Sequence, residues 1–147
     1  MKLRCAAFGN GQLIPAKFTC DGENRSPPLL ISDVPGGTKS LALICDDPDA
    51  PSGTFVHWVV WDMDASAREM PEGAVRMGQE GMNDFRKSGY GGPCPPRGHG
   101  THRYSFRLYA LDTLLGKKGI NSKEDLERAM EGHILSSAEL MGTYKRD

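Results

Sequence analysis

Glycine and proline interrupt this chain at short intervals, so its apolar runs are brief. The 147 residues include 18 glycines and 10 prolines, spread along the whole length. Short apolar runs separated by turn residues are typical of many strands joined by loops, as in a β-sandwich. The pattern predicts strands over residues 2–8, 16–20, 28–33, 40–47, 55–63, 102–112 and 134–145.

One segment, residues 122–132, is predicted to be helical. Asn121 and Ser122 are candidate N-caps, and Gly132 is the expected end. The stretch 64–101 is rich in Gly, Pro, Asn and Asp and is predicted to be mostly irregular. A loop of this length in a compact domain is usually functional or else wrongly assigned. No repeat or linker divides the chain, so we expect a single domain over residues 1–147.

The overall charge is nearly balanced. A formal net charge of −1 gives no global field that would attract nucleic acid or an anionic membrane, so we expect neither partner. The N-terminal residues 1–18 lack the apolar core of a secretory signal, and no apolar run approaches the roughly 20 residues of a membrane helix. These features predict a cytoplasmic protein without integral membrane association.

The four cysteines are Cys5, Cys20, Cys45 and Cys94, and their spacing matches no CxxC zinc or redox motif. In a cytoplasmic protein we therefore expect reduced structural thiols. Cys45 lies in an apolar run and is expected to be a small buried hydrophobe. Cys94 differs, because it lies among prolines in a glycine-rich loop, where an exposed thiol would be oxidisable.

Three predicted central strands each place an ionisable side chain on an apolar face, since side chains alternate between the two faces of a strand. The first face carries Leu41, Leu43 and Cys45 and then Asp47; the second carries Phe55, Val59 and Trp61 with His57 among them; the third carries Phe106, Leu108 and Ala110 with Tyr104 and His102. A buried polar group without a partner costs about 1–3 kcal/mol. We therefore expect Asp47, His57, His102 and Tyr104 to share one pocket.

Such a pocket could hold an anion. Two imidazoles and a phenol offer N–H and O–H donors, and a neighbouring carboxylate would fix the tautomer of one histidine and raise its pKa. The segments PDAP, residues 48–51, and PCPP, residues 93–96, would form stiff and mostly apolar walls. Gly91 and Gly92 would let the backbone approach a ligand closely.

The same residues resemble a known family. DPDAP followed by HW, and then GPCPPRGHGTHRYSFRLYAL, are similar to the two signature regions of the phosphatidylethanolamine-binding protein (PEBP) family, in its bacterial and archaeal Raf kinase inhibitor-like branch. The resemblance covers roughly residues 2–145. It implies a Greek-key antiparallel β-sandwich with one or two short helices, and a pocket that takes phosphate, a phosphorylated head group or a carboxylate.

The resemblance also implies the site residues. The first signature supplies Asp47, Ala50, Pro51 and His57; the second supplies Pro95, Pro96, His102 and Tyr104, with Tyr90 opening its loop. Arg103 points away from His102 along the strand, so we interpret it as structural and paired with an acid such as Asp49.

The function that follows is non-enzymatic binding of a small anion without a cofactor. By resemblance, the domain could also inhibit a protein kinase or a protease. The helix that closes the pocket in animal members has no counterpart after Tyr144, which leaves a more open mouth that could favour a homodimer or a different ligand. Two alternatives stay open: a phosphoester or ester hydrolase that uses Asp47, His57 and His102, and a metal site of two histidines and one aspartate.

Overall fold

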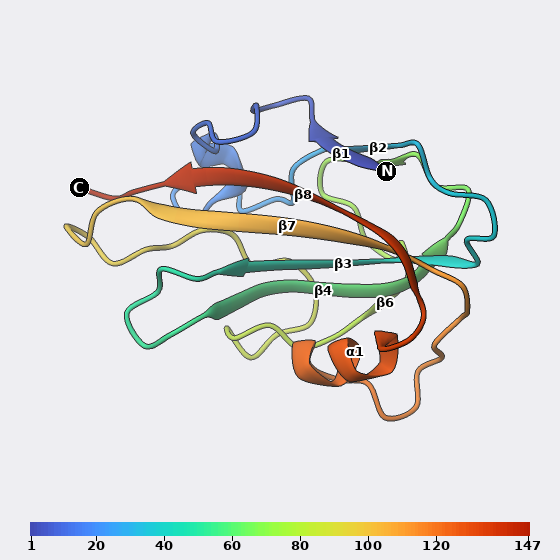
Figure 1. Cartoon of the computed structure of the whole chain (residues 1–147). Coiled ribbons are helices and arrows are strands. Elements are labelled where there is room, and N and C mark those ends of the chain that lie inside the picture. Colours follow the sequence, from blue (N-terminus) through green and yellow to red (C-terminus); the bar gives the residue numbers. More distant parts are fainter.

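Two antiparallel sheets form the body of the protein (Figure 1). The computed structural model describes residues 1–147. The larger sheet has the order β6-β4-β3-β7-β8, and the smaller has the order β1-β2-β5. The strands are β1 (Lys2–Cys5), β2 (Leu29–Ser32), β3 (Ser40–Asp47), β4 (Phe55–Asp64), β5 (Glu69–Met70), β6 (Gln79–Glu80), β7 (His102–Leu111) and β8 (Ile134–Tyr144). The predicted antiparallel β-sandwich is confirmed.

The main core lies between the two sheets. Leu3 and Ile31 of the smaller sheet belong to the same buried cluster as Leu41, Leu43 and Phe106 of the larger one. Their alternation along β3 and β7 matches the predicted faces, because both strands pair in unbroken register from Leu41–Ala110 to Asp46–Ser105.

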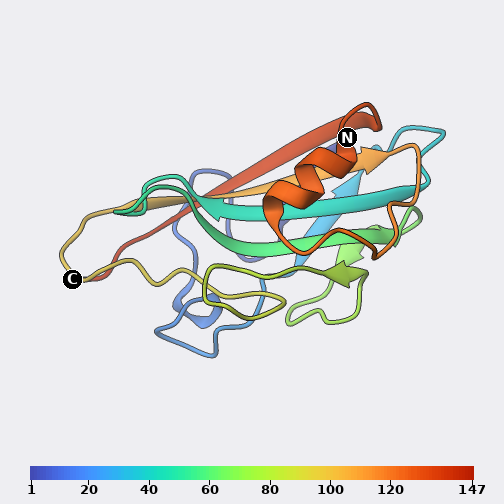
Figure 2. The same cartoon turned by 90° about the horizontal axis from the view of Figure 1, so that it is seen from below.

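A single α-helix, α1 (Lys123–Met130), covers the opposite face of the larger sheet; Figure 2 shows it in front of β3 and β4. Ser122 caps it in a capping box with Asp125, as the polar start of the predicted helix indicated. Leu126 and Met130 are its buried side chains, in a second cluster that includes Ile44. The helix therefore has the amphipathic pattern of a surface helix packed on a sheet.

Three predicted elements differ from the structure. Residues 16–20 form a 3-10 helix, η1 (Ala16–Phe18), instead of a strand, because Pro15 begins a turn in which its carbonyl accepts from the Phe18 N–H. The first strand ends at Cys5. The irregular stretch 64–101 contains β5 and β6, whose two-residue length is too short for an alternation pattern to reveal.

Strand β4 contains two irregularities that reverse its faces. Cys45 pairs with Trp58 and Asp46 pairs with Val56, so His57 is the extra residue of a β-bulge. A second register shift lies farther along the strand, between the partners of Leu41 and Leu43. The predicted face of β4 is therefore wrong in part: Phe55 stays with His57, but Val59 and Trp61 turn to the α1 side of the sheet.

No helix of the structure combines the length and the apolar character needed to cross a membrane.

Candidate ligand-binding site

A pocket of about 550 Å³ opens at the end of the larger sheet where β3 ends and β4 and β7 begin. Every predicted site residue except Tyr90 lines it: Asp47, Ala50, Pro51, His57, Pro95, Pro96, His102 and Tyr104. The remaining lining residues are Ser52, Gly53, Thr54, Phe55, Asp84, Phe85 and Cys94. The structure thus brings the ionisable ends of the three central strands into one cavity.

A chain of hydrogen bonds runs from Asp47 to the surface. Nδ1 of His102 lies 2.6 Å from Oδ2 of Asp47, and Nε2 of His102 lies 2.7 Å from Nδ1 of His99. Asp47 and His102 are buried, whereas His99 is exposed. An ionised carboxylate only accepts, so Nδ1 of His102 carries the proton in this pair. Sequence reasoning missed His99, whose only signal is its position three residues before His102.

The bulge in β4 aims His57 at the pocket and ties it to a neighbouring loop. Nδ1 of His57 lies 2.6 Å from the Gly91 carbonyl oxygen, and the Gly91 N–H donates to the His57 carbonyl at 2.9 Å. The contact of Nδ1 is the single side-chain hydrogen bond of His57, so the other ring nitrogen, Nε2, makes none within the protein. Burial lowers the pKa of His57 and outweighs the raising effects of the Gly91 hydrogen bond and of Asp47. The nearby carboxylate pairs with His102 instead, so the pKa increase expected for a carboxylate-paired histidine does not apply to His57.

Tyr104 is the least satisfied polar residue of the site. It is only 1% exposed, and its hydroxyl group makes no hydrogen bond of regular geometry, although a side-chain contact with Asp47 contributes to its raised pKa. Burial and the negative charge of Asp47 raise the pKa of this phenol, so it stays protonated at neutral pH. A buried hydroxyl without a partner is unusual and requires an explanation.

Arg103 holds the first wall of the pocket in place. Its guanidinium makes a two-point ion pair with Asp49, at 2.9 Å from Nε and 2.8 Å from Nη2, and its backbone N–H also donates to Asp49. The side-chain hydrogen bond from Arg103 lowers the pKa of Asp49 to about 2. The structural role proposed for Arg103 from the sequence is therefore confirmed in its geometry.

Two aromatic residues at the mouth were not predicted as site residues. Phe55 and Phe85 meet edge to face with ring centroids 4.8 Å apart, and the Phe85 centroid lies 5.4 Å from that of His57. A Cβ atom on Gly91 would collide with the Phe85 ring, so this glycine allows close packing of Phe85. The sequence predicts that Gly91 lets the backbone approach a ligand; in the structure it lets the Phe85 ring approach the backbone instead.

Known proteins are similar to this chain in sequence and fold. The family model described as "Phosphatidylethanolamine-binding protein" matches residues 5–145. The chain belongs to the PEBP family. Among curated relatives, a UPF0098 protein of Pyrococcus horikoshii is 49% identical over 149 residues, which cover 96% of this chain and 75% of the relative. The UPF0098 protein of Aquifex aeolicus is 49% identical over 153 residues, covering 100% of this chain and 90% of the relative.

Solved PEBP structures superpose on almost the whole chain. A PEBP homologue from Chlamydia trachomatis has a TM-score of 0.94 at 44% identity and covers 99% of this chain and 97% of its own. YbcL of E. coli has a TM-score of 0.90 at 30% identity, with coverages of 99% and 98%. The relatives carry family names rather than names of enzymatic activities.

Tyr90 of this PEBP chain lies apart from the pocket. Its hydroxyl donates to the Phe18 carbonyl at 2.7 Å, and its ring packs edge to face on Trp58 with centroids 5.3 Å apart. These contacts give it a packing role between η1 and the larger sheet.

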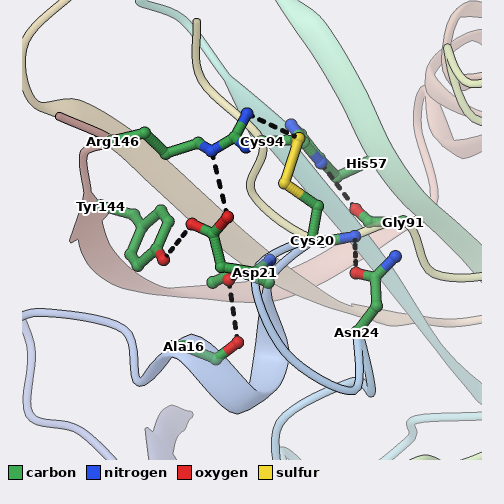
Figure 3. The surroundings of a disulfide bond; sticks show 11 residues. Ala16, Cys20, Asp21, Asn24, His57, Gly91, Cys94, Tyr144 and Arg146 are labelled. Atoms are coloured by element: carbon green, nitrogen blue, oxygen red, sulfur yellow. Dashed lines mark hydrogen bonds and ion pairs between the residues drawn. A yellow bond between two sulfur atoms is a disulfide. The ribbon is translucent and has the colours of Figure 1, made fainter. Parts of the chain in front are cut away.

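The cysteines correct one expectation. Cys20 and Cys94 form a disulfide with a Cα–Cα distance of 5.4 Å, so the prediction of reduced thiols is wrong for this pair (Figure 3). Spacing could not reveal it, because the two residues are 74 positions apart and meet only in the fold. Cys45 is free and buried, as predicted, and burial raises the pKa of its thiol.

The disulfide lies beside a small polar cluster. Asp21 accepts hydrogen bonds from the Tyr144 hydroxyl at 2.6 Å and from Nε of Arg146 at 3.2 Å, and Nη1 of Arg146 lies 3.5 Å from Sγ of Cys94 (Figure 3). Cys20 follows η1, and Cys94 lies in the PCPP wall of the pocket, residues 93–96. The disulfide and this cluster therefore connect the region after η1 to that wall.

The third interpretation of the pocket is a metal site made of two histidines and one aspartate. No group of three or more His, Cys, Asp and Glu side chains is arranged to hold a metal ion. Both nitrogens of His102 are already engaged, by Asp47 and by His99.

Proposed function

We propose that the pocket binds a small anion: phosphate, a phosphorylated head group or a carboxylate. The observation that carries the proposal is the buried Tyr104 hydroxyl, which makes no hydrogen bond of regular geometry in the protein and belongs to a residue that lines the cavity. A ligand oxygen would accept its hydrogen and remove a desolvation cost of about 1–3 kcal/mol.

Several features support this ligand class. His57 places a free ring nitrogen in the lining, and Ser52 and Thr54 add hydroxyl groups. The proline walls and the Arg103–Asp49 ion pair keep the cavity open before binding, so little ordering cost falls on the complex.

We propose binding without turnover. A hydrolase that uses His102 as general base would need one ring nitrogen free to take a proton from water or a nucleophile. Nδ1 is paired with Asp47 and Nε2 with His99, so His102 has no free nitrogen to act as that base. Incubation with generic phosphoester and ester substrates tests this directly, and turnover abolished by His57→Ala would establish the hydrolase alternative.

The decisive experiment compares two tyrosine variants in a thermal-shift titration with sodium phosphate. Phosphate should raise the melting temperature of the native protein by mass action. Tyr104→Phe should weaken that shift without lowering the ligand-free melting temperature, because the lost hydroxyl had no partner. Tyr90→Phe, the matched control, should lower the ligand-free melting temperature but keep the phosphate shift. An unchanged phosphate shift in Tyr104→Phe would contradict the proposal.

The family resemblance supports a second role, inhibition of a protein kinase or a protease, and we also propose a homodimer. Assays against panels of purified kinases and proteases test the first. Size-exclusion chromatography with light scattering tests the second, and a monomer at every concentration would refute it.

We also propose a cytoplasmic location. The Cys20–Cys94 disulfide argues against a reducing compartment, because disulfides are rare there except in hyperthermophiles. Thiol trapping in the source cells, combined with fractionation, would show in which compartment the oxidised protein resides.

A further inference from the structure

One edge of the larger sheet is covered over only half of its length. β8 is the outermost strand of that sheet and pairs with β7 on its inner side (Figure 1). Residues 10–14 run along the outer side of its C-terminal half, where the Met141 carbonyl accepts from the Gly11 N–H at 2.6 Å and the Thr143 N–H donates to the Gln12 carbonyl at 2.9 Å. No segment pairs with the outer side of residues 134–139.

The uncovered half leaves main-chain groups without partners. Met141 and Thr143 direct their N–H and C=O groups outward, and this direction alternates along residues 136–144, whose register with β7 is unbroken. Ser137 and Glu139 therefore direct theirs outward as well, where no hydrogen bond is made. Such a row of free groups is a template for an added strand.

The three other sheet edges are protected against pairing. β5 and β6 have two residues each, and β1 carries the exposed cations Lys2 and Arg4. Short length and charge, especially lysine, are the usual means by which natural sheets keep an edge unpaired. Residues 134–138 of β8, ILSSA, contain neither a charge nor a proline. The free half of β8 thus lacks these protective features.

We propose that the free half of β8 pairs with the same segment of a second copy of this chain, antiparallel about a two-fold axis at Ser137. This inference rests on the homodimer proposed above and names its surface. Each Ser137 N–H donates to the partner's Ser137 carbonyl, so the two larger sheets join into one. Ser136 and Ala138 are small, which lets the two strands approach. Glu139 lies opposite the partner's Leu135, and not opposite a second carboxylate.

Apolar side chains at the two ends of the free edge favour a second copy as the occupant. Leu13, on the covering segment, is 61% exposed, and Ile134 and Leu135, at the start of β8, are 46% and 44% exposed. Two-fold pairing brings the start of each β8 toward the partner's covering segment, so these side chains shield one another from water at both ends. One surface therefore complements itself, as a symmetric dimer requires.

The surface lies away from the pocket. β7 and β8 approach the pocket at the pair His102–Tyr144, whereas the free half begins at the other end of the ladder, at Leu111–Ile134. Pairing through β8 leaves both pockets open. The phosphate-induced shift in melting temperature therefore reports on the pocket independently of the dimer.

Sedimentation velocity over a concentration series tests the surface. The native protein should show a species of twice the 16.0 kDa chain mass, and dilution should dissociate it because a single strand pair buries little area. Ser137→Lys should lose this species, since two lysines meet at the axis, and should keep the native phosphate shift. Leu30→Lys, at an exposed residue of β2, is the matched control and should dimerise like the native protein.

Cysteine cross-linking tests the register. Both variants are made with Cys5→Ser, which removes the partly exposed free thiol. Ser137→Cys should form a disulfide between copies in air, because Cα atoms of directly opposite, hydrogen-bonded residues lie about 5.5 Å apart, within the range of a disulfide. Glu139→Cys should not, because the two copies of residue 139 lie four residues out of register, about 14 Å apart.

The outcomes separate this surface from the earlier proposals. A native protein that is monomeric at every concentration overturns the homodimer and the surface together. A dimer that persists in Ser137→Lys, or that cross-links through Glu139→Cys instead of Ser137→Cys, overturns the surface and leaves the homodimer standing. A missing phosphate shift in the native protein overturns anion binding alone.

Discussion

Asp47 and His102, 55 positions apart in the sequence, lie 2.6 Å from each other at the base of the pocket. They stand at adjacent ends of β3 and β7, strands whose register is continuous up to the pair Asp46–Ser105. Both side chains are almost completely buried, at 4% and 1% exposure. Their contact therefore links the core of the larger sheet directly to the candidate site.

Removing the carboxylate should cost stability. Asp47→Ala leaves the Nδ1–H group of His102 buried without an acceptor, and we expect a loss of about 1–3 kcal/mol in the free energy of unfolding. Chemical denaturation measures this loss. The double variant Asp47→Leu, His102→Leu should be less destabilised than the sum of its single variants, because both partners are replaced together. Additive effects would show that the contact contributes little.

Loss of the disulfide should destabilise the protein more. Cys20→Ser with Cys94→Ser opens a long closed loop, and we expect a loss of about 2–5 kcal/mol. Reductant should produce a similar loss in the native protein. Cys5→Ser, at a free and partly exposed cysteine, is the control that should stay close to the native stability. Identical denaturation curves with and without reductant would contradict the bond.

The native protein should lose stability in weak acid through His57. Its folded pKa lies below the unfolded value of 6.5, so the unfolded chain binds this proton first. The contribution of His57 is therefore fully present above pH 6.5 and falls as the pH drops from that value toward the folded pKa. His57→Gln should flatten the decrease when unfolding is measured from pH 7.5 to pH 5, whereas His133→Gln should retain it. An equal slope in both variants would remove His57 as the cause.

The capping box at the start of α1 should stabilise this helix, which packs on the second hydrophobic cluster. The Ser122 hydroxyl accepts from the Asp125 N–H at 3.1 Å, and Ser122→Ala should cost about 1 kcal/mol. Ser122→Asp, which keeps an acceptor, should restore most of that loss. Thermal unfolding checks both variants, and equal melting temperatures for the alanine variant and the native protein would disprove a role for the cap.

The sequence allowed the faces of β3 and β7 to be predicted because both strands alternate regularly. It did not allow this for β4, where the bulge at His57 changes which side chains face the core, and no residue type marks that bulge. His57 nevertheless reaches the pocket, since it precedes the shift together with Phe55.

Contacts between residues far apart in the sequence could not be predicted for a different reason. The Cys20–Cys94 bond, the contact of Tyr90 with Phe18 and the packing of Phe85 on Phe55 all join segments brought together only by the assembled sandwich. Local patterns carry no information on such distances. The family motifs identified the pocket walls, but not the exposed His99 that completes the hydrogen-bonded chain.

That chain connects the buried Asp47–His102 pair to bulk water by a route that bypasses the cavity. A ligand that fills the mouth would cover Tyr104 and His57, yet His99 would still exchange hydrogens with solvent and pass them from ring to ring toward Asp47. The Asp47–His102 pair therefore keeps a hydrogen-bonded route to solvent whether or not a guest fills the cavity.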